Sequence, residues 1–309
     1  MTQALSFTRL AVLLTVVAAS SQAVAKNLDG ALAWVPGDAS TLVAFDLEGA
    51  KKAEFFREIQ KQLIDLTGYG RDIAQMKRDG IDVMTSVKTV VFAGPDAALK
   101  KKTESVIILE GSFDQAKIRA FYEKKDKRPL TEKTSPIGPY LELGSGSFVM
   151  FDGNFLVFGT KGYFPSALAA RQMKGGAKMT RIAALLGRVK SSKHGFGIIA
   201  GSDILKKFLG KNFGAMKDVK EAALALDFST GLSLSIIGVF PSAAKASEVA
   251  KVVDGEMKKL AGDPELKEVG LEDALKKVQT KAAGAELTIA LALEGASAKA
   301  FASSLKELF

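Results

Sequence analysis

The sequence predicts an α+β fold made of two related units, each an antiparallel β-sheet with helices packed against it. Three observations lead to this prediction. Short runs of β-branched and aromatic residues alternate with amphipathic helical segments. Two pairs of these runs are joined by tight turns that contain glycine, as in antiparallel hairpins. The order strand, helix, strand, strand, helix, hairpin and helix occurs twice along the chain.

The first 25 residues have the features of a secretory signal peptide. Arg9 precedes the apolar run Leu10 to Ala19, and Ala23-Val24-Ala25 supplies an A-x-A cleavage site. The run is too short to span a bilayer, which takes roughly 20 residues. We therefore expect a mature chain that begins at Lys26, is exported to the periplasm or the exterior, and has no membrane span after cleavage.

The first unit is expected to occupy residues 26–174. Apolar residues at three- and four-residue steps predict a long amphipathic helix over residues 51–66. Ser112 and Gln115 predict a capping box for the helix after the third strand. The charged residues 124–135 are expected to form a loop. The expected strands are 41–47, 89–93, 104–111 and 140–143, and the other expected helices are 71–77, 113–125 and 165–173.

The stretch Ser147 to Thr160 gives the strongest hairpin signal in the chain. Asp152-Gly153 can supply the two central residues of a type I′ turn between two apolar runs. With a two-residue turn, one face of the hairpin carries Phe148, Met150, Phe155 and Val157. The opposite face carries Val149, Phe151, Leu156 and Phe158. Because both faces are apolar, we expect a cover on each side, and the second set is a candidate face for an apolar ligand or for the other unit.

Gly175-Gly176 separates the two units, and the second unit, residues 178–309, repeats the pattern. A second hairpin is expected around Ala283-Gly284, followed by a closing helix over 297–309. The other expected elements are helices 180–189, 202–209, 242–260 and 263–277, and strands 195–201, 221–228 and 232–240.

Matching landmarks indicate an internal duplication, with coincidental likeness of two small α+β units as the alternative. Gly111 and Gly238 both stand where a strand leads into a helix, and Gly162 and Gly295 both stand between a hairpin and the last helix. The strands of the first unit carry large residues on both faces, whereas those of the second carry small residues on one. The second sheet thus needs one cover of helices. The first needs two, and its second cover could be the other unit, a partner protein or a lipid.

The residues for common catalytic chemistry are missing. The chain has no cysteine and one histidine, His194, so a typical zinc site cannot be built. His194 is expected to be a loop residue at a strand entrance, and no G-x-S-x-G motif accompanies it. The glycine spacings do not match nucleotide-binding loops. We expect no catalytic residue, metal or cofactor. A hydrolase using the carboxylates of residues 263–273 is a remote alternative, because lysines surround them as on a solvated helix.

The meaning of the formal net charge of +9 depends on where the protein is located, and we expect it to be exported. An exported basic protein meets anionic lipid, polysaccharide or cell wall rather than nucleic acid. Lys100, Lys101 and Lys102 are the candidate contact with such an anionic surface. The alternative is that the charge only maintains solubility.

Several segments resemble a loose group of uncharacterised secreted proteins of Gram-negative bacteria, often from myxobacteria and their relatives. The segments are ALAWVPGDASTLVAFDLEGAKKAEFF (31–56), GIDVMTSVKTVVFAG (80–94), GSFDQAKIRAFYEKK (111–125) and FDGNFLVFGT (151–160). Members of the group open with a Leu-x-Pro-x-x-Ala lead, here Trp34-Val35-Pro36-Gly37-Asp38-Ala39. The resemblance implies a periplasmic or surface protein and supplies no catalytic residues.

Together these features favour an exported, non-enzymatic binding or scaffolding protein of the bacterial cell envelope. Its expected partner is an envelope protein, a lipid or a polysaccharide. The alternative is a periplasmic carrier or chaperone for a lipid or another apolar ligand.

Overall fold

The structure is a computed structural model that describes residues 24–67, 70–95, 104–173, 177–189, 192–201, 205, 214–268 and 271–308. Most of the expected signal peptide, the linker Gly175-Gly176 and the candidate lysines Lys100, Lys101 and Lys102 lie outside these residues. None of the helices within them is long and apolar enough to cross a membrane.

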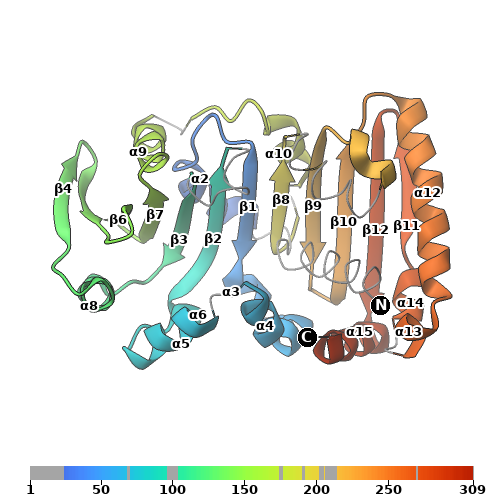
Figure 1. Cartoon of the computed structure of the whole chain (residues 1–309), viewed down its shortest axis with the longest axis horizontal. Coiled ribbons are helices and arrows are strands. Elements are labelled where there is room, and N and C mark those ends of the chain that lie inside the picture. Colours follow the sequence, from blue (N-terminus) through green and yellow to red (C-terminus); the bar gives the residue numbers. More distant parts are fainter. Residues whose placement is uncertain are drawn as a thin grey trace.

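In the part of the chain that the structure describes, the strands form one antiparallel sheet of 12 strands at the centre (Figure 1). Its strands are β1 (Thr41–Asp46), β2 (Val87–Gly94), β3 (Val106–Gly111), β4 (Thr131–Ser135), β5 (Gly138–Glu142), β6 (Ser147–Asp152), β7 (Phe155–Thr160), β8 (Gly195–Ile199), β9 (Glu221–Asp227), β10 (Gly231–Val239), β11 (Gln279–Ala283) and β12 (Glu286–Glu294). β1 from the first half of the chain (26–174) pairs with β8 from the second half (178–309). The protein is therefore α+β, but with one continuous sheet in place of the two sheets expected.

The strand order is the same in both halves when it is followed outward from the β1–β8 seam. One direction gives β1, β2, β3, β7 and β6, and the other gives β8, β9, β10, β12 and β11. β5 and β4 extend the first half beyond this common pattern. In each half, three strands lie outward from the seam in chain order. The hairpin lies next to them, and its second strand, β7 or β12, is the one that pairs with the third strand.

The expected hairpin is present, but its turn lies one residue later than predicted. Asp152 pairs with Phe155, so Gly153 and Asn154 form the loop. Gly153 has φ of +59° and takes the first loop position, where glycine stands in a type II′ turn. The predicted faces are nevertheless correct, because the pairing moves by two residues and side chains alternate with a period of two. The β11–β12 hairpin has the same arrangement, with Gly284 at φ of +58°.

The two faces of the sheet differ across the seam. We call one the α2 face, and its middle row runs Tyr140, Met150, Val157, Ile108, Val91, Ala44, Phe196, Ala225, Ser235 and Ala290. We call the other the α8 face, and its row runs Leu141, Val149, Phe158, Ile107, Phe92, Val43, Gly197, Leu224, Ile236 and Ile289. The first half is large on both faces, and the second half is small on the α2 face, as predicted.

Helices cover the faces where large side chains require it. α9 (Phe164–Gln172), α2 (Val24–Leu32) and α10 (Ala183–Val189) cover the α2 face from β7 across the seam to β9. On the α8 face, α8 (Gln115–Asp126) packs on the hairpin, α12 (Ala243–Ala261) on the far edge, and α3 (Leu47–Ala50) and α4 (Glu54–Thr67) near the seam. α15 (Gly295–Leu308) packs on β10 and β12, beside α4. The remaining helices among the described residues are α5 (Gly70–Arg78), α6 (Val83–Ser86), η1 (Gly214–Asp218), α13 (Pro264–Glu268) and α14 (Glu272–Lys276).

α4 crosses from the first half onto the second. Its Phe55, Phe56 and Ile59 belong to one buried cluster with Leu226 and Phe228 of the second half. α4 also lies beside α15, at the lower ends of the strands in Figure 1. The halves therefore share a hydrophobic core in addition to the β1–β8 pairing.

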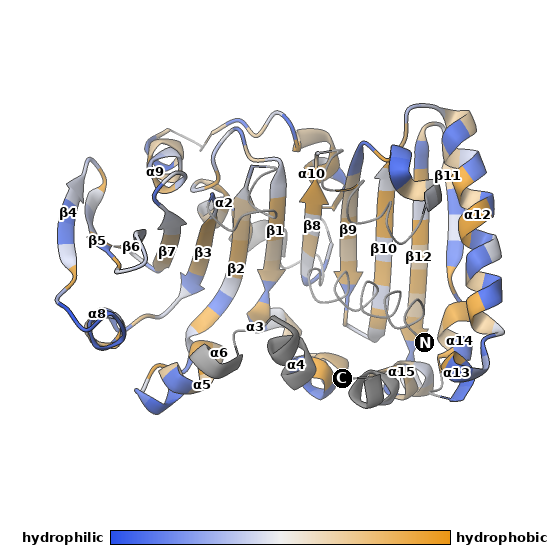
Figure 2. Cartoon of the chain, viewed as in Figure 1, coloured by the Kyte–Doolittle hydropathy of each residue, from blue (hydrophilic) through white to orange (hydrophobic). Residues whose placement is uncertain are grey.

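The edge strand β4 lies in residues that were expected to form a loop. Its sequence TEKTS contains no apolar side chain, and all of it except Ser135 is exposed. Figure 2 shows this contrast, since β4 is largely hydrophilic while β1 and β8 are hydrophobic. A polar edge strand gives no alternation for a sequence pattern to detect.

Candidate functional site

The outer face of the β6–β7 hairpin lies under α8 of its own half. Val149 and Leu156 are 1% and 3% exposed and share a buried cluster with Ile118 of α8. Phe151 and Phe158 pack against this cluster and stay partly exposed. The cover for this face is therefore mainly α8, and neither the second half nor a ligand is needed to bury Val149 and Leu156.

α8 is capped at both ends and packs on the hairpin through its apolar side. Asp114, rather than the predicted Ser112, caps the helix, and its Oδ1 accepts the N–H of Lys117 at 3.0 Å. Lys127 ends the helix with a left-handed φ of +54°. Tyr122 reaches the hairpin, with its ring centroid 5.9 Å from that of Phe158.

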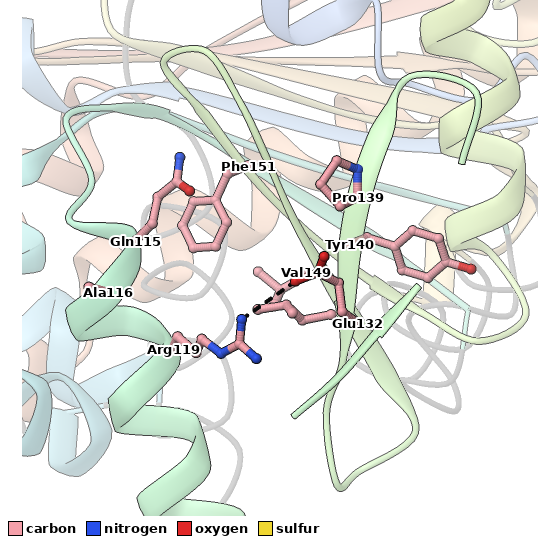
Figure 3. Close-up of a pocket in the computed structure, with 9 residues that line it drawn as sticks. Gln115, Ala116, Arg119, Glu132, Pro139, Tyr140, Val149 and Phe151 are labelled. Carbon is pink, nitrogen blue, oxygen red and sulfur yellow. Dashed lines mark hydrogen bonds and ion pairs between the residues drawn. The ribbon is translucent and has the colours of Figure 1, made fainter. Parts of the chain in front are cut away.

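A groove of about 270 Å³ remains between the first turns of α8 and strands β4 to β6 (Figure 3). Its lining residues are Gln115, Ala116, Arg119, Glu132, Pro139, Tyr140, Leu141, Val149 and Phe151. Tyr140 contributes mainly its backbone, because its ring packs on Phe148 and Phe164 on the α2 face. The groove therefore combines an apolar floor with a polar rim.

Arg119 organises the charge at this rim. Its Nε donates to Oε1 of Glu123 at 3.1 Å, and its Nη1 lies 3.5 Å from Oε2 of Glu132. The hydrogen bond from Arg119 lowers the pKa of Glu123, and the N–H of Leu130 adds to this effect. The guanidinium thus links α8 to β4 and stands at the mouth of the groove (Figure 3).

The groove contains half of the predicted hairpin face. Val149 and Phe151 line it, whereas Leu156 and Phe158 do not. The sequence analysis missed Arg119 and Glu132, because Arg119 looked like a solvated helix residue and Glu132 lay in the expected loop. The only available signal was their opposite charge, which does not indicate that β4 folds back beside α8.

A second feature of the α8 face is an apolar strip at the centre of the sheet. Val43, Phe92 and Ile107 are neighbours on adjacent strands, and each is partly exposed. Within the described part of the chain, they join none of the four buried clusters. The strip continues into Phe158 of the hairpin.

The single histidine lies directly before β8, at a strand entrance as predicted. Its ring is buried, and burial lowers the pKa of His194 to about 3. Nδ1 accepts the backbone N–H of Phe228 at 3.4 Å, so the ring acts as a neutral acceptor. Among the residues described, no three metal-ligating side chains are grouped. In the acidic segment, Glu272 pairs with Lys267 and Lys276 on the surface, as expected for a solvated helix.

Comparisons with known proteins are sparse. No protein-family model matches the chain, and no curated protein matches it. A solved structure titled "Structure of crystal form I of TP0453" is similar with a TM-score of 0.45 and 13% identity, over 90% of this chain and 97% of that chain. This likeness is too distant to carry an argument about fold or function.

Proposed function

We propose that this chain is an exported, non-enzymatic binding or scaffolding protein of the bacterial cell envelope. We further propose that the groove between α8 and β4–β6 receives an apolar side chain of an envelope protein. The observation that supports this is the groove itself, because it leaves Phe151 accessible beside the charged pair Arg119 and Glu132. An accessible aromatic beside an arginine is typical of the residues that contribute most to protein interfaces.

The size of the groove favours a protein partner over a whole lipid. Sites for drug-sized ligands measure roughly 300–1,000 Å³. At about 270 Å³ the groove lies below this range, which favours insertion of a single side chain over a whole lipid. Arg119 and Glu132 would orient that side chain's backbone or a polar neighbour.

The alternative function, a carrier or chaperone for a lipid or other apolar ligand, is favoured by a different observation. Val43, Phe92 and Ile107 present a contiguous apolar strip that is partly exposed. A ligand lying on this strip would bury surface that the described helices leave accessible.

We also infer that the two halves, 26–174 and 178–309, arose by internal duplication. The shared strand order and the shared glycine-first hairpin turns support this inference. α2 and α10 each precede the first strand of their half and cover the same face. One element differs, since α9 packs on the α2 face whereas α15 packs on the α8 face.

Two substitutions distinguish protein binding at the groove from ligand binding on the apolar strip. We would compare Phe151→Ser and Phe92→Ser in the mature chain, since both residues are partly exposed phenylalanines of the same face. Loss of an envelope protein partner in Phe151→Ser alone supports the binding function. Loss of a co-purifying lipid in Phe92→Ser alone, seen by native mass spectrometry, supports the carrier. Wild-type protein that captures neither partner nor lipid contradicts both.

A further inference from the structure

His194 stands at the point where the two halves meet. Its carbonyl oxygen accepts the N–H of Asp46 at 2.8 Å, which extends the β1–β8 pairing by one bond. Its side chain is 11% exposed, and its ring centroid lies 6.1 Å from that of Phe228. The ring is therefore enclosed by β1 of the first half and by the end of β9 of the second half.

The imidazole also supports the contact between α4 and the second half. Nδ1 accepts the N–H of Phe228, whose ring centroid lies 5.6 Å from those of both Phe55 and Phe56 of α4. Phe56 in turn packs on Phe45 of β1, with centroids 5.7 Å apart. We call Phe45, Phe55, Phe56 and Phe228 the junction cluster. The acceptor bond orients Phe228 within it only while Nδ1 carries no proton.

The charged groups around the imidazole offset a positive charge only in part. Asp227 Oδ1 lies 3.9 Å from Nδ1, but Asp227 also pairs with Lys193 at 3.7 Å and accepts the N–H of Ser229. On the β1 side, a Cβ placed on Gly49 would clash with Asp46 and lie 3.0 Å from Cδ2 of His194, so both side chains pack against the backbone of Gly49. Burial raises the pKa of Asp46, which weakens it as a counter-charge.

We propose that His194 is an acid-sensitive switch, whose protonation breaks the bond to Phe228 and releases α4 from the second half. A proton on Nδ1 would set two N–H donors against each other and place a positive charge in a buried site where it is only partly compensated. Release would expose the junction cluster and leave the antiparallel seam to hold the halves together. The proposal does not depend on the α8 groove, which lies at the other end of the first half.

The sign of the pH dependence follows from linkage. The pKa of His194 is about 3 in the closed junction, against about 6.5 for an exposed histidine. The open state therefore binds the proton more tightly, and opening is favoured as pH falls below about 6.5, by roughly tenfold per pH unit down to about 3. Above about pH 7 the switch is closed.

Hydrogen exchange of the mature chain between pH 7.5 and 4.5 tests the switch, after correction for intrinsic exchange rates. In the wild type, protection of the Phe228 amide and of residues 54–60 should fall by up to about 100-fold. In His194→Gln, which keeps a neutral acceptor at every pH, protection should change by less than about threefold. Helix α12 is the internal control, and its protection should not change in either protein.

A second measurement keeps the test decisive if His194→Gln fails to fold. His194 is the only histidine, so the proton on its Cε1 gives one NMR signal that reports the protonation of the ring directly. If His194 acts as this switch, the chemical shift of the signal should report a neutral ring until hydrogen-exchange protection at the junction is lost. A ring that titrates near pH 6.5 with the junction still protected overturns the proposal, as does an equal loss of protection in a folded His194→Gln.

Discussion

Nε of Arg171 in α9 donates to Oδ2 of Asp152 at 2.8 Å, and Nη2 forms an ion pair with the same oxygen at 2.7 Å. Asp152 is the last residue of β6, immediately before the hairpin turn. The same guanidinium lies 5.6 Å from the ring centroid of Trp34, which is fully buried. One side chain therefore ties the hairpin to α9 and to the segment that follows α2.

Arg171→Ala should destabilise the protein by about 1–2 kcal/mol, because it removes a hydrogen-bonded ion pair and a cation–π contact. Urea unfolding measures this loss. The matched control is Arg188→Ala, whose side chain is 44% exposed and pairs with Glu286 on the surface. That change should cost less than about 0.5 kcal/mol. Equal losses in the two variants would contradict the role given to Arg171.

Gly49→Ala should destabilise the protein by about 1–3 kcal/mol, the range for overpacking a filled site. The new Cβ would clash with the Asp46 carboxylate and crowd the His194 ring. Gly255→Ala is the control, because nothing lies within 4 Å of a Cβ at that position in α12. It should stabilise the protein by roughly 0.5–1 kcal/mol, since alanine favours helix. An unaffected Gly49→Ala would show that the packing described at the seam is wrong, and a destabilised Gly255→Ala would show that the control position in α12 is not open.

Tyr163→Phe should cost about 1.5–3 kcal/mol, because the Tyr163 hydroxyl donates to Oδ1 of Asp38 at 3.1 Å. Burial and the nearby Asp38 carboxylate raise the pKa of Tyr163 far above its usual value, so the donor keeps its proton. The loss should therefore be constant between pH 6 and 9, below the ordinary phenol pKa of about 10. Denaturant unfolding at several pH values would reveal it. Tyr140→Phe, which keeps the ring contacts with Phe148 and Phe164, should change stability much less.

Local patterns predicted the elements better than their pairing. The two faces of the β6–β7 hairpin were predicted correctly because alternation with a period of two depends only on neighbouring residues. The small α2 face of the second half was also visible in its alternating alanines and serines. The pairing of β1 with β8 was not predicted, since partners far apart in sequence leave no local trace.

The candidate site was predicted in part for the same reason. Val149 and Phe151 were identified because large residues on both strand faces need a cover. Arg119 and Glu132 were missed because their roles depend on β4, a polar strand without a hydrophobic pattern. The junction at His194 was expected to be an ordinary loop, because burial by Phe228 and Gly49 depends on tertiary packing.

The most direct test of the proposed function is site-specific photo-cross-linking in intact cell envelopes. A photoreactive side chain replaces Ala116, an exposed residue in the first turns of α8 that lines the groove. The control position is Ala244, an exposed alanine in the first turn of α12, which follows β10 as α8 follows β3. We predict one discrete protein adduct from position 116, none from position 244, and loss of the adduct when Phe151→Ser is added. The absence of an adduct at position 116, or the same adducts from both positions, would contradict the account.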